Sequence, residues 1–173
     1  MDFTSTSDKY PVAVIGAGSF GTAVANLLAE NGEVLFYSRR PEAVEIINKE
    51  RKNNGQDIHP NVKATNDMQE IADRCYLLFP SVSSDAFREV MQSMAQYLRP
   101  HHMMIHCTKG FDIKLEPGKT ILDKDVVLQP SDIYTMSKVI LEETCVKRVG
   151  CMSGPNLARE IANQHPAATV IAS

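Results

Sequence analysis

The stretch Val12–Gly32 decides the fold and reads VAVIGAGSFGTAVANLLAENG. Its first four residues form a continuous apolar run with two valines and an isoleucine, which is typical of a buried parallel strand. Glycines at positions 16, 18 and 21 follow this run. Beyond them, apolar residues recur at the spacing of one helix face, namely Phe20, Ala23, Val24, Leu27 and Leu28. The stretch therefore predicts a strand, a tight turn and a helix.

Each of the three glycines has a physical reason in such a turn. Gly16 lets the chain leave the strand sharply, Gly18 lets a pyrophosphate approach the backbone, and Gly21 lets the helix pack close to the strand. The free N–H groups and the dipole of the first helical turn favour an anion, and Ser19 adds a hydroxyl donor there. The spacing alone is a weak signal, but the flanking strand and helix support a dinucleotide site. The alternative is a structural turn that binds no ligand.

Length and composition indicate one globular domain. The chain has 173 residues, of which 43% are hydrophobic and 23% charged. Its net charge of −3 implies no general attraction to nucleic acid, and no apolar run approaches the ~20 residues of a membrane span. We expect residues 1–9 to form a flexible tail and residues 10–173 to form the domain. The four cysteines share no Cys-x-x-Cys spacing, so we expect reduced, mostly buried thiols in a cytoplasmic protein.

The rest of the chain alternates between strand and helix patterns. Further strands are expected at 34–37, 62–65, 75–79, 103–107, 149–152 and 169–172. Helices are expected at 41–52, 67–73, 84–99, 133–145 and from Gly154-Pro155 onward. Asn53-Asn54-Gly55 is expected to end the first of these helices, and Phe111–Ser131 fits no clear pattern. Alternating strands and helices predict a doubly wound, mostly parallel α/β sheet of the Rossmann type.

The end of the second expected strand bears on the choice of cofactor. NAD-binding members of this fold usually carry Asp or Glu there, which accepts a hydrogen bond from the ribose 2′-hydroxyl. This chain has Tyr37-Ser38-Arg39-Arg40 instead. A guanidinium can pair with a 2′-phosphate, and a charge-assisted hydrogen bond contributes roughly 1.5–3 kcal/mol. We expect Arg39 and Arg40 to favour NADP(H), with NAD(H) as a second cofactor; the alternative is a solvated loop.

Three further polar stretches follow expected strands directly. They are Pro80-Ser81, Thr108-Lys109-Gly110 and Ser153-Gly154-Pro155-Asn156. Because ligands of open α/β sheets bind beyond the carboxyl ends of the strands, these stretches are expected to surround one crevice. A lysine, hydroxyl groups and a helix start suit an anionic, for example phosphorylated, substrate. Taken singly, Lys109 is equally compatible with an ordinary surface lysine, and Gly154-Pro155 with an ordinary helix start.

Histidines near position 101 raise the question of a metal site. His101, His102 and His106 lie close in sequence to Cys107. Adjacent histidines in a loop and a strand make a poor tetrahedral set, so we expect solvated loop residues and no metal.

Three motifs occur together and in order. They are Gly16-Ala17-Gly18-Ser19-Phe20-Gly21-Thr22-Ala23, Thr108-Lys109-Gly110 and Ser153-Gly154-Pro155-Asn156-Leu157-Ala158-Arg159-Glu160. With residues 62–67 and 166–173, they make the chain resemble the N-terminal cofactor domain of bacterial-type NAD(P)-dependent glycerol-3-phosphate dehydrogenase, from about Val12 onward. Many dehydrogenases share the first motif, whereas the lysine and Gly-Pro motifs in this order are much more specific.

The resemblance implies reduction of dihydroxyacetone phosphate to sn-glycerol 3-phosphate, a precursor of phospholipids, in an enzyme whose complete form could be a homodimer. Besides the glycines Gly16, Gly18 and Gly21, it implies cofactor contacts at Ser19, Phe20, Arg39, Arg40, Lys109 and Ala158. It implies substrate contacts at Lys109, Gly154 and Asn156. In that role Lys109 would neutralise substrate charge and hold the carbonyl carbon near the nicotinamide.

Two departures and one missing part qualify the resemblance. The family usually has Ser or Thr at the position of Asn156, and the Phe111–Ser131 segment is longer than the family pattern. The family also has a second, all-helical domain that carries an acid–base lysine and phosphate-gripping residues, and nothing in this chain matches it. We therefore expect no catalytic residue within this chain, which would be a shortened piece of a longer enzyme that binds the dinucleotide but turns over poorly.

Two other functions remain open at this point. One is a related dehydrogenase such as a ketopantoate or hydroxyisobutyrate reductase, which the Thr-Lys-Gly and Gly-Pro-Asn motifs disfavour. The other is a non-catalytic NADP(H)-sensing module. The reading frame beyond Ser173 separates this second function from the enzyme.

Overall fold

The glycine-rich stretch folds as predicted in the computed structural model, which describes residues 10–115, 118–123 and 126–173. Strand β1 (Val12–Ile15) enters a tight turn, and helix α1 (Ser19–Ala29) follows directly. The tail expected at residues 1–9 lies outside the described residues.

Close contacts explain two of the three glycines. Gly16 has a φ of +116°, and a Cβ there would lie 2.7 Å from Cγ1 of Val82 and 2.9 Å from the carbonyl oxygen of Ser81. A Cβ on Gly21 would lie 2.0 Å from the carbonyl oxygen of Gly16, so α1 touches the turn at this point. A Cβ on Gly18 would meet no atom within 4 Å. The packing of the chain therefore requires Gly16 and Gly21 but leaves Gly18 without a structural reason.

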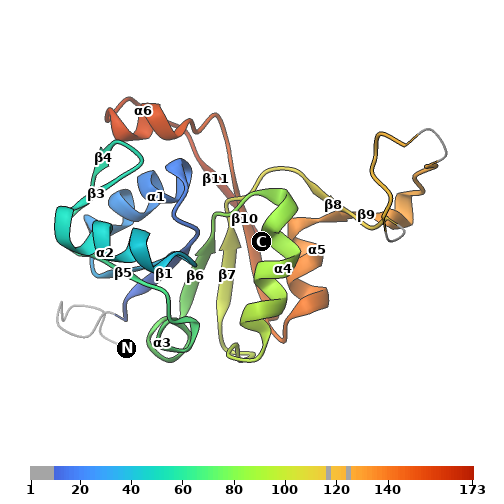
Figure 1. Cartoon of the computed structure of the whole chain (residues 1–173), viewed down its shortest axis with the longest axis horizontal. Helices are drawn as coiled ribbons and strands as arrows, with labels where there is room; N and C mark the ends of the chain where they lie inside the picture. The colour runs from blue at the N-terminus through green and yellow to red at the C-terminus, as the bar shows by residue number, and fades with distance from the viewer. Residues whose placement is uncertain (1–9, 116–117, 124–125) are drawn as a thin grey trace.

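Among the described residues, seven strands form one sheet in the order β11-β10-β7-β6-β1-β2-β5 (Figure 1). Neighbouring strands are parallel except for β10 and β11, which are antiparallel. The remaining bounds are β2 (Val34–Tyr37), β5 (Val62–Thr65), β6 (Leu77–Pro80), β7 (Met103–His106), β10 (Arg148–Ser153) and β11 (Val170–Ala172). The doubly wound, mostly parallel α/β sheet is thus confirmed.

Helices cover both faces of the sheet. Neighbouring residues of β1 point to opposite faces: Ile15 packs in one core cluster with Phe87, and Val14 packs in the other with Val24 and Ile47. Burial on both faces explains why the strands read as continuous apolar runs rather than alternating ones. The helices after α1 are α2 (Pro41–Glu50), α3 (Met68–Arg74), α4 (Ser84–Ala95), α5 (Met136–Glu143) and α6 (Ala158–Ala162).

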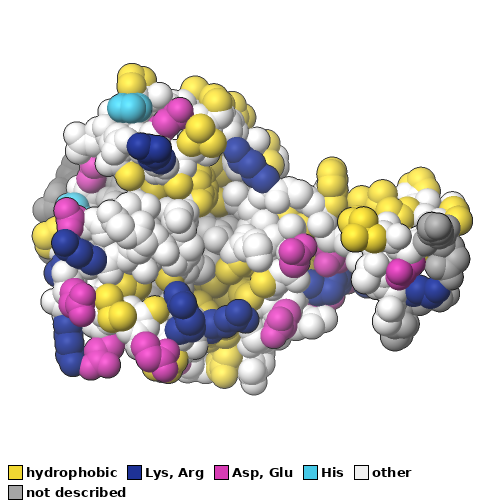
Figure 2. Space-filling view, turned by 45° about the horizontal axis from the view of Figure 1, so that its top comes forward, with side chains coloured by type: hydrophobic (Ala, Val, Ile, Leu, Met, Phe, Trp, Pro, Cys, Tyr) yellow, Lys and Arg dark blue, Asp and Glu magenta, His cyan; other side chains and the backbone are white. Residues whose placement is uncertain are grey.

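Two short antiparallel hairpins add to the main sheet in the described part of the chain. The first pairs β3 (Lys52–Asn53) with β4 (Gln56–Asp57), where the sequence analysis expects only a helix end and a loop. The second pairs β8 (Phe111–Ile113) with β9 (Ile133–Thr135), and the described residues between these two strands project from the body as an arm (Figures 1 and 2). Exposed apolar side chains of this arm are Phe111, Ile121, Leu122, Val127, Leu128 and Ile133.

Charged side chains fix the base of the arm. Arg88 of α4 pairs with Asp112 of β8 and with Glu142 of α5, both at 2.8 Å. Lys114 also pairs with Glu142, at 2.9 Å. The ammonium of Lys138 lies 3.9 Å from the ring centroid of Tyr134. These contacts attach the arm to the two helices beside it.

The cysteines and one strand boundary differ from the expectation. Cys75 does not lie in a strand: its N–H donates to the carbonyl of Ile71 at the end of α3, and β6 begins at Leu77. Burial raises the pKa of the Cys75 thiol to about 12, which suits an unreactive core residue. Cys107 is buried, but Cys151 is only partly buried.

The helix expected from Ile133 begins later. Ile133 lies in β9, and α5 starts at Met136 because the hydroxyl of Thr135 accepts a hydrogen bond from the N–H of Lys138. The last strand, which the sequence places in a parallel sheet, runs antiparallel to β10 because the chain reverses through α6 and the loop after it.

We predict that Gly21→Ala lowers the free energy of unfolding by about 1–3 kcal/mol, since the added methyl overlaps the carbonyl of Gly16. Urea unfolding followed by circular dichroism measures this loss. Gly32→Ala is the control, because a Cβ there has open space and the change is expected to stay within about 0.5 kcal/mol. Equal stability of the two variants would contradict the close packing of α1 on the turn.

Candidate functional site

The carboxyl ends of the parallel strands meet at one edge of the sheet. The chain leaves β1 to one side for β2 and β5, and it later builds β6 and β7 on the other side. This reversal creates a crevice beyond β1 and β6, the place where ligands of open α/β sheets bind. Backbone bonds align the edge: the N–H of Ser81 donates to the carbonyl of Ile15 at 2.8 Å, and that of Cys107 donates to Pro80 at 2.7 Å.

A cleft of about 520 Å³ occupies this crevice and is lined by the segments that follow β1, β6, β7 and β10. It brings together six predicted site residues, namely Gly18, Ser19, Phe20, Lys109, Asn156 and Ala158. Its other lining residues are Ser81, Val82, Ser83, Ser84, Cys107, Thr108 and Leu157. Among the described residues of this lining, Lys109 is the only one with a charged side chain. The cleft therefore offers hydroxyl groups, backbone groups and a single positive charge.

The start of α1 forms one wall of the cleft. Gly18 is the N-cap residue in an extended conformation, no side chain caps the helix, and its first turn contains no acidic residue. The N–H groups of this turn and the helix dipole therefore favour an anion. The open space at Gly18 lets such an anion reach the backbone, whereas a side chain there would fill the cradle. These residues fit the diphosphate of a dinucleotide.

Lys109 joins two of the loops. It directly follows Thr108, whose hydroxyl donates to the carbonyl of Val82 at 2.7 Å and so ties the β7 loop to the β6 loop. The ammonium of Lys109 donates to the carbonyl of Gly154 at 3.0 Å, across to the loop after β10. Thr108 is buried while Lys109 is exposed. The backbone beneath the lysine is thus anchored, and its charged end reaches the cleft.

The loop after β10 differs from the predicted helix start. Helix α6 begins only after Leu157, and Gly154 has a φ of +142°, with a Cβ there placed 2.3 Å from the carbonyl oxygen of Ala168. Asn156 is 5% exposed, and its side-chain oxygen accepts a hydrogen bond from the hydroxyl of Thr169 at 3.1 Å. The bend at Gly154 therefore turns Asn156 inward before α6 can start, and this tertiary packing is what the sequence pattern missed.

The two arginines lie apart from the Lys109 cleft. Both Arg39 and Arg40 are exposed, and the N–H of Arg40 donates to the hydroxyl of buried Ser38 at 3.3 Å. Arg40 lines a second cleft of about 370 Å³, which it shares with Lys52 and Asn54 among others. The predicted site residues thus divide into a group around α1 and Lys109 and a group at the end of β2.

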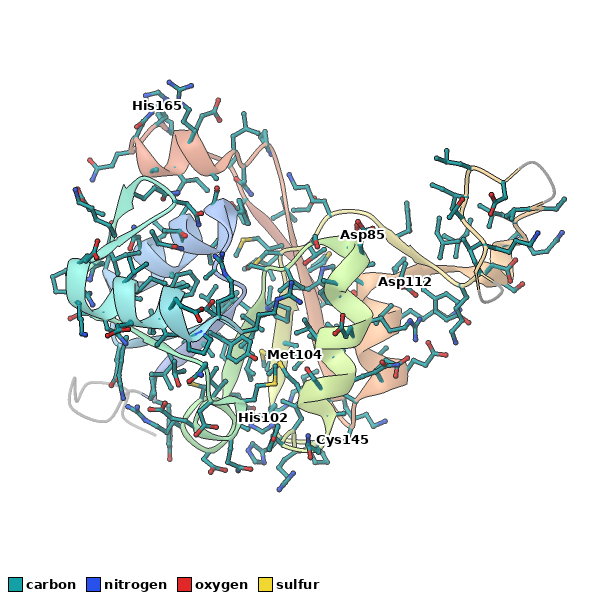
Figure 3. All side chains as sticks on the ribbon, in the orientation of Figure 1. Asp85, His102, Met104, Asp112, Cys145 and His165 are labelled. Carbon is teal, nitrogen blue, oxygen red and sulfur yellow. The ribbon has the colours of Figure 1, made fainter. Side chains whose placement is uncertain are left out.

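The histidines correct another expectation. His102 is buried and not part of a solvated loop, and its Nε2 lies 3.0 Å from the carbonyl oxygen of Ala72. His106 lies in the strand expected at 103–107 and is also buried, with its Nε2 2.9 Å from the hydroxyl oxygen of Ser137. His102 directly precedes β7, at the end of the sheet away from Asp85 (Figure 3), and His106 is the last residue of β7. Within the described residues, no three His, Cys, Asp or Glu side chains gather as a metal site requires. In that same part of the chain, every helix is too short or too polar to cross a membrane.

Comparison with known proteins identifies the family. Residues 11–173 match the family model described as NAD-dependent glycerol-3-phosphate dehydrogenase N-terminus. The chain belongs to this family. It is 40% identical over 172 residues to a glycerol-3-phosphate dehydrogenase [NAD(P)+] of Pseudomonas fluorescens, an alignment that covers 96% of this chain and 44% of that protein. This glycerol-3-phosphate dehydrogenase domain thus spans less than half the length of that relative.

Solved structures agree with this assignment. A glycerol-3-phosphate dehydrogenase from Coxiella burnetii has a TM-score of 0.74 at 28% identity, over 94% of this chain and 46% of that one. The enzyme from Saccharomyces cerevisiae has a TM-score of 0.78 at 22% identity, over 95% and 47%, and shows likeness of fold. The dehydrogenase-type resemblance inferred from the three motifs is therefore confirmed.

Within this glycerol-3-phosphate dehydrogenase domain, His106 lies directly beneath the Lys109 loop. Its Nδ1 lies 3.3 Å from the carbonyl oxygen of Thr108, and its other ring nitrogen contacts Ser137 of α5. Burial lowers the pKa of His106 below its ordinary value of 6.5, although the hydrogen bond to Thr108 opposes this. The folded protein therefore binds the proton of His106 more weakly than the unfolded chain does.

We predict a corresponding loss of stability in acid. The contribution of neutral His106 is complete above pH 6.5 and is lost as the pH falls below that value, since protonation then favours the unfolded state. Urea unfolding at pH 7.5 and pH 5.5 measures the difference, which His106→Gln should reduce. His165→Gln at an exposed histidine should behave as wild type. A pH dependence unchanged in His106→Gln would contradict this assignment.

Proposed function

We propose that this chain is the dinucleotide-binding half of an enzyme that reduces dihydroxyacetone phosphate to sn-glycerol 3-phosphate with NADPH. One observation carries the proposal: a single cation, Lys109, shares a cleft with the uncapped start of α1 and no carboxylate lines that cleft. A dinucleotide diphosphate and a phosphorylated substrate are both anions, and the described lining of this cleft contains no negative charge that would repel either of them. The names of the related proteins support the same reaction.

The roles of the residues follow from their positions. The N–H groups at Gly18, Ser19 and Phe20 would hold the diphosphate, with Gly16 and Gly21 fixing the turn behind them. When bound, a nicotinamide cofactor would supply the hydride. Lys109 would hold the substrate by its charge, and Asn156 and the carbonyl of Gly154 lie next to it. Ala158 would border the cofactor from the start of α6.

The contribution of this half is positioning and electrostatics. Lys109 is proposed to hold the substrate by its charge, and we propose that proton transfer to the new hydroxyl comes from outside the described lining, as the family resemblance implies for the lysine of the second domain. We therefore propose that residues 10–173 act as the cofactor domain of a longer cytoplasmic enzyme that supplies the backbone of phospholipids and works as a homodimer. Alone, the chain would bind the dinucleotide and turn over little.

The preference for NADP(H) has its own support. Arg40 and Lys52 line one cleft near the end of β2, and Arg39 lies exposed beside it in sequence. Arginine and lysine can pair with a 2′-phosphate, whereas the carboxylate usual in NAD-binding members is absent from Tyr37-Ser38-Arg39-Arg40.

We predict that the chain binds NADPH about tenfold to hundredfold more tightly than NADH, the range that one charge-assisted hydrogen bond supplies. Arg40→Ala should weaken NADPH binding and leave NADH binding unchanged, as isothermal titration calorimetry would show. Lys49→Ala is the matched control, because Lys49 is an exposed cation on α2, the helix that begins directly after Arg40. Equal affinity for the two cofactors, or tighter binding of NADH, would defeat the preference.

The substrate is tested on the protein encoded by the complete gene. We expect NADPH oxidation with dihydroxyacetone phosphate and none with ketopantoate, because Lys109 and Asn156 suit a phosphorylated triose. Activity with ketopantoate instead would favour the related reductase, and dinucleotide binding without turnover of either compound would favour the NADP(H)-sensing module.

A further inference from the structure

Three amide side chains on the β3–β4 hairpin reach the back of the glycine-rich turn. We propose that Asn53, Asn54 and Gln56 are positioning residues that aim the backbone N–H groups of the turn at the dinucleotide diphosphate. We call these three side chains the amide strap. The inference rests on the proposed dinucleotide function and concerns residues that do not line the Lys109 cleft.

The strap donates to oxygen atoms of the turn and of α1. The side-chain nitrogen of Asn53 donates to the carbonyl of Ala17 at 3.1 Å and to the hydroxyl of Thr22 at 2.8 Å. The amide of Asn54 donates to the same carbonyl of Ala17 at 2.9 Å. The amide of Gln56 donates to the carbonyl of Ser19 at 3.2 Å. Every strap bond thus ends on an oxygen behind the proposed cradle.

Because a peptide group is planar, these hydrogen bonds also fix the direction in which the N–H groups of the turn point. In a trans peptide, the carbonyl of one residue and the N–H of the next point in opposite directions within one plane. Holding the carbonyl of Ala17 towards the hairpin therefore aims the N–H of Gly18 away from it. Holding the carbonyl of Ser19 does the same for the N–H of Phe20.

The intervening peptide is fixed in the same way. The hydroxyl of Thr22 donates to the carbonyl of Gly18 at 2.8 Å, and the N–H of Thr22 donates to that carbonyl at 2.9 Å. The N–H of Ser19 is thereby directed like its two neighbours. Since Asn53 also contacts the Thr22 hydroxyl, one hairpin side chain supports two consecutive peptide planes.

The hairpin is held in place by other contacts. The side chain of Asn26 on α1 donates to the carbonyl of Asp57 at 2.7 Å and accepts from the N–H of His59 at 2.9 Å. The N–H of Ile58 donates to the carbonyl of Arg51 at 2.8 Å. A strap side chain can therefore be removed while the hairpin keeps its attachment to the body.

The third strap residue, Gln56, has a buried polar atom that lowers the stability of the hairpin. Its side-chain oxygen is buried and has no hydrogen-bond partner among the described residues, while its side-chain nitrogen donates to the carbonyl of Ser19. A buried polar atom without a partner opposes folding. Placing Gln56 here is unfavourable for the hairpin itself, which agrees with a role in directing the turn.

The experiment compares strap variants with a matched amide elsewhere. Asn53→Ala and Gln56→Ala are titrated with NADPH. Gln56→Ala is also titrated with adenosine 2′-monophosphate, which lacks the diphosphate, because Gln56 does not line the Arg40 cleft, whereas Asn53 and Asn54 do. Asn48→Ala is the control, because Asn48 also uses its side chain on backbone groups, donating to the carbonyl of Ala64 at 2.9 Å and accepting from its N–H at 2.8 Å. Hydrogen exchange of the Gly18, Ser19 and Phe20 amides is followed in each variant.

We expect Asn53→Ala and Gln56→Ala each to weaken NADPH binding about tenfold, and Gln56→Ala to leave binding of adenosine 2′-monophosphate unchanged. With NADPH bound, exchange at Gly18 should be faster in Asn53→Ala than in Asn48→Ala, because a misdirected N–H is protected less by the diphosphate. Gln56→Ala removes one bond, to the carbonyl of Ser19, so it provides the same comparison if Asn53→Ala unfolds.

Three results would overturn the inference, and they differ in what they mean for the proposed function. If wild type binds NADPH and the strap variants bind it as tightly as Asn48→Ala does, the strap has no positioning role while the proposed function stands. If Gln56→Ala lost as much affinity for adenosine 2′-monophosphate as for NADPH, the result would show general damage to the domain and would also refute a role specific to the diphosphate. If wild type does not bind NADPH, the proposed function fails and the inference fails with it.

Discussion

The close approach of α1 to the turn after β1 is the constraint on which the site depends. The carbonyl of Gly16 lies where a side chain on Gly21 would be, so the helix begins as near to the end of β1 as backbone atoms allow. This contact brings the uncapped start of α1 over the sheet edge, where its N–H groups can serve a ligand. A larger residue at position 21 would move the helix start and the cradle together.

The sheet order then decides which loops can join this helix start. Because β6 and β7 extend the sheet on the side of β1 opposite to β2, the segments after β6, β7 and β10 open onto one cleft. Thr108 connects the β7 loop to the β6 loop, and Lys109 connects it to the loop after β10. The same topology sends the end of β2, with Arg40, to a separate cleft.

Local patterns were readable from the sequence, and features set by tertiary contacts were not. The strand, turn and helix of Val12–Gly32 were predictable because apolar periodicity and glycine spacing lie within one continuous stretch. The burial of His102 was not predictable, since it depends on the carbonyl of Ala72, thirty residues away in sequence. The β3–β4 hairpin did have a signal in the sequence, because Asn54-Gly55 is a favoured hairpin turn. This pair was interpreted only as the end of the preceding helix.

The absence of carboxylates from the lining of the Lys109 cleft links fold and chemistry. A diphosphate near α1 and a phosphate near Lys109 would repel one another, and only dipoles, amides and one cation are there to offset this. Fixed dipoles stabilise an anion best when they need no reorganisation, so the binding free energy of the anion depends on the direction of each N–H group. Neutral amides such as those of Asn53 and Asn54 suit this purpose, because they hold carbonyl groups without adding a charge that would compete with Lys109 for the anions.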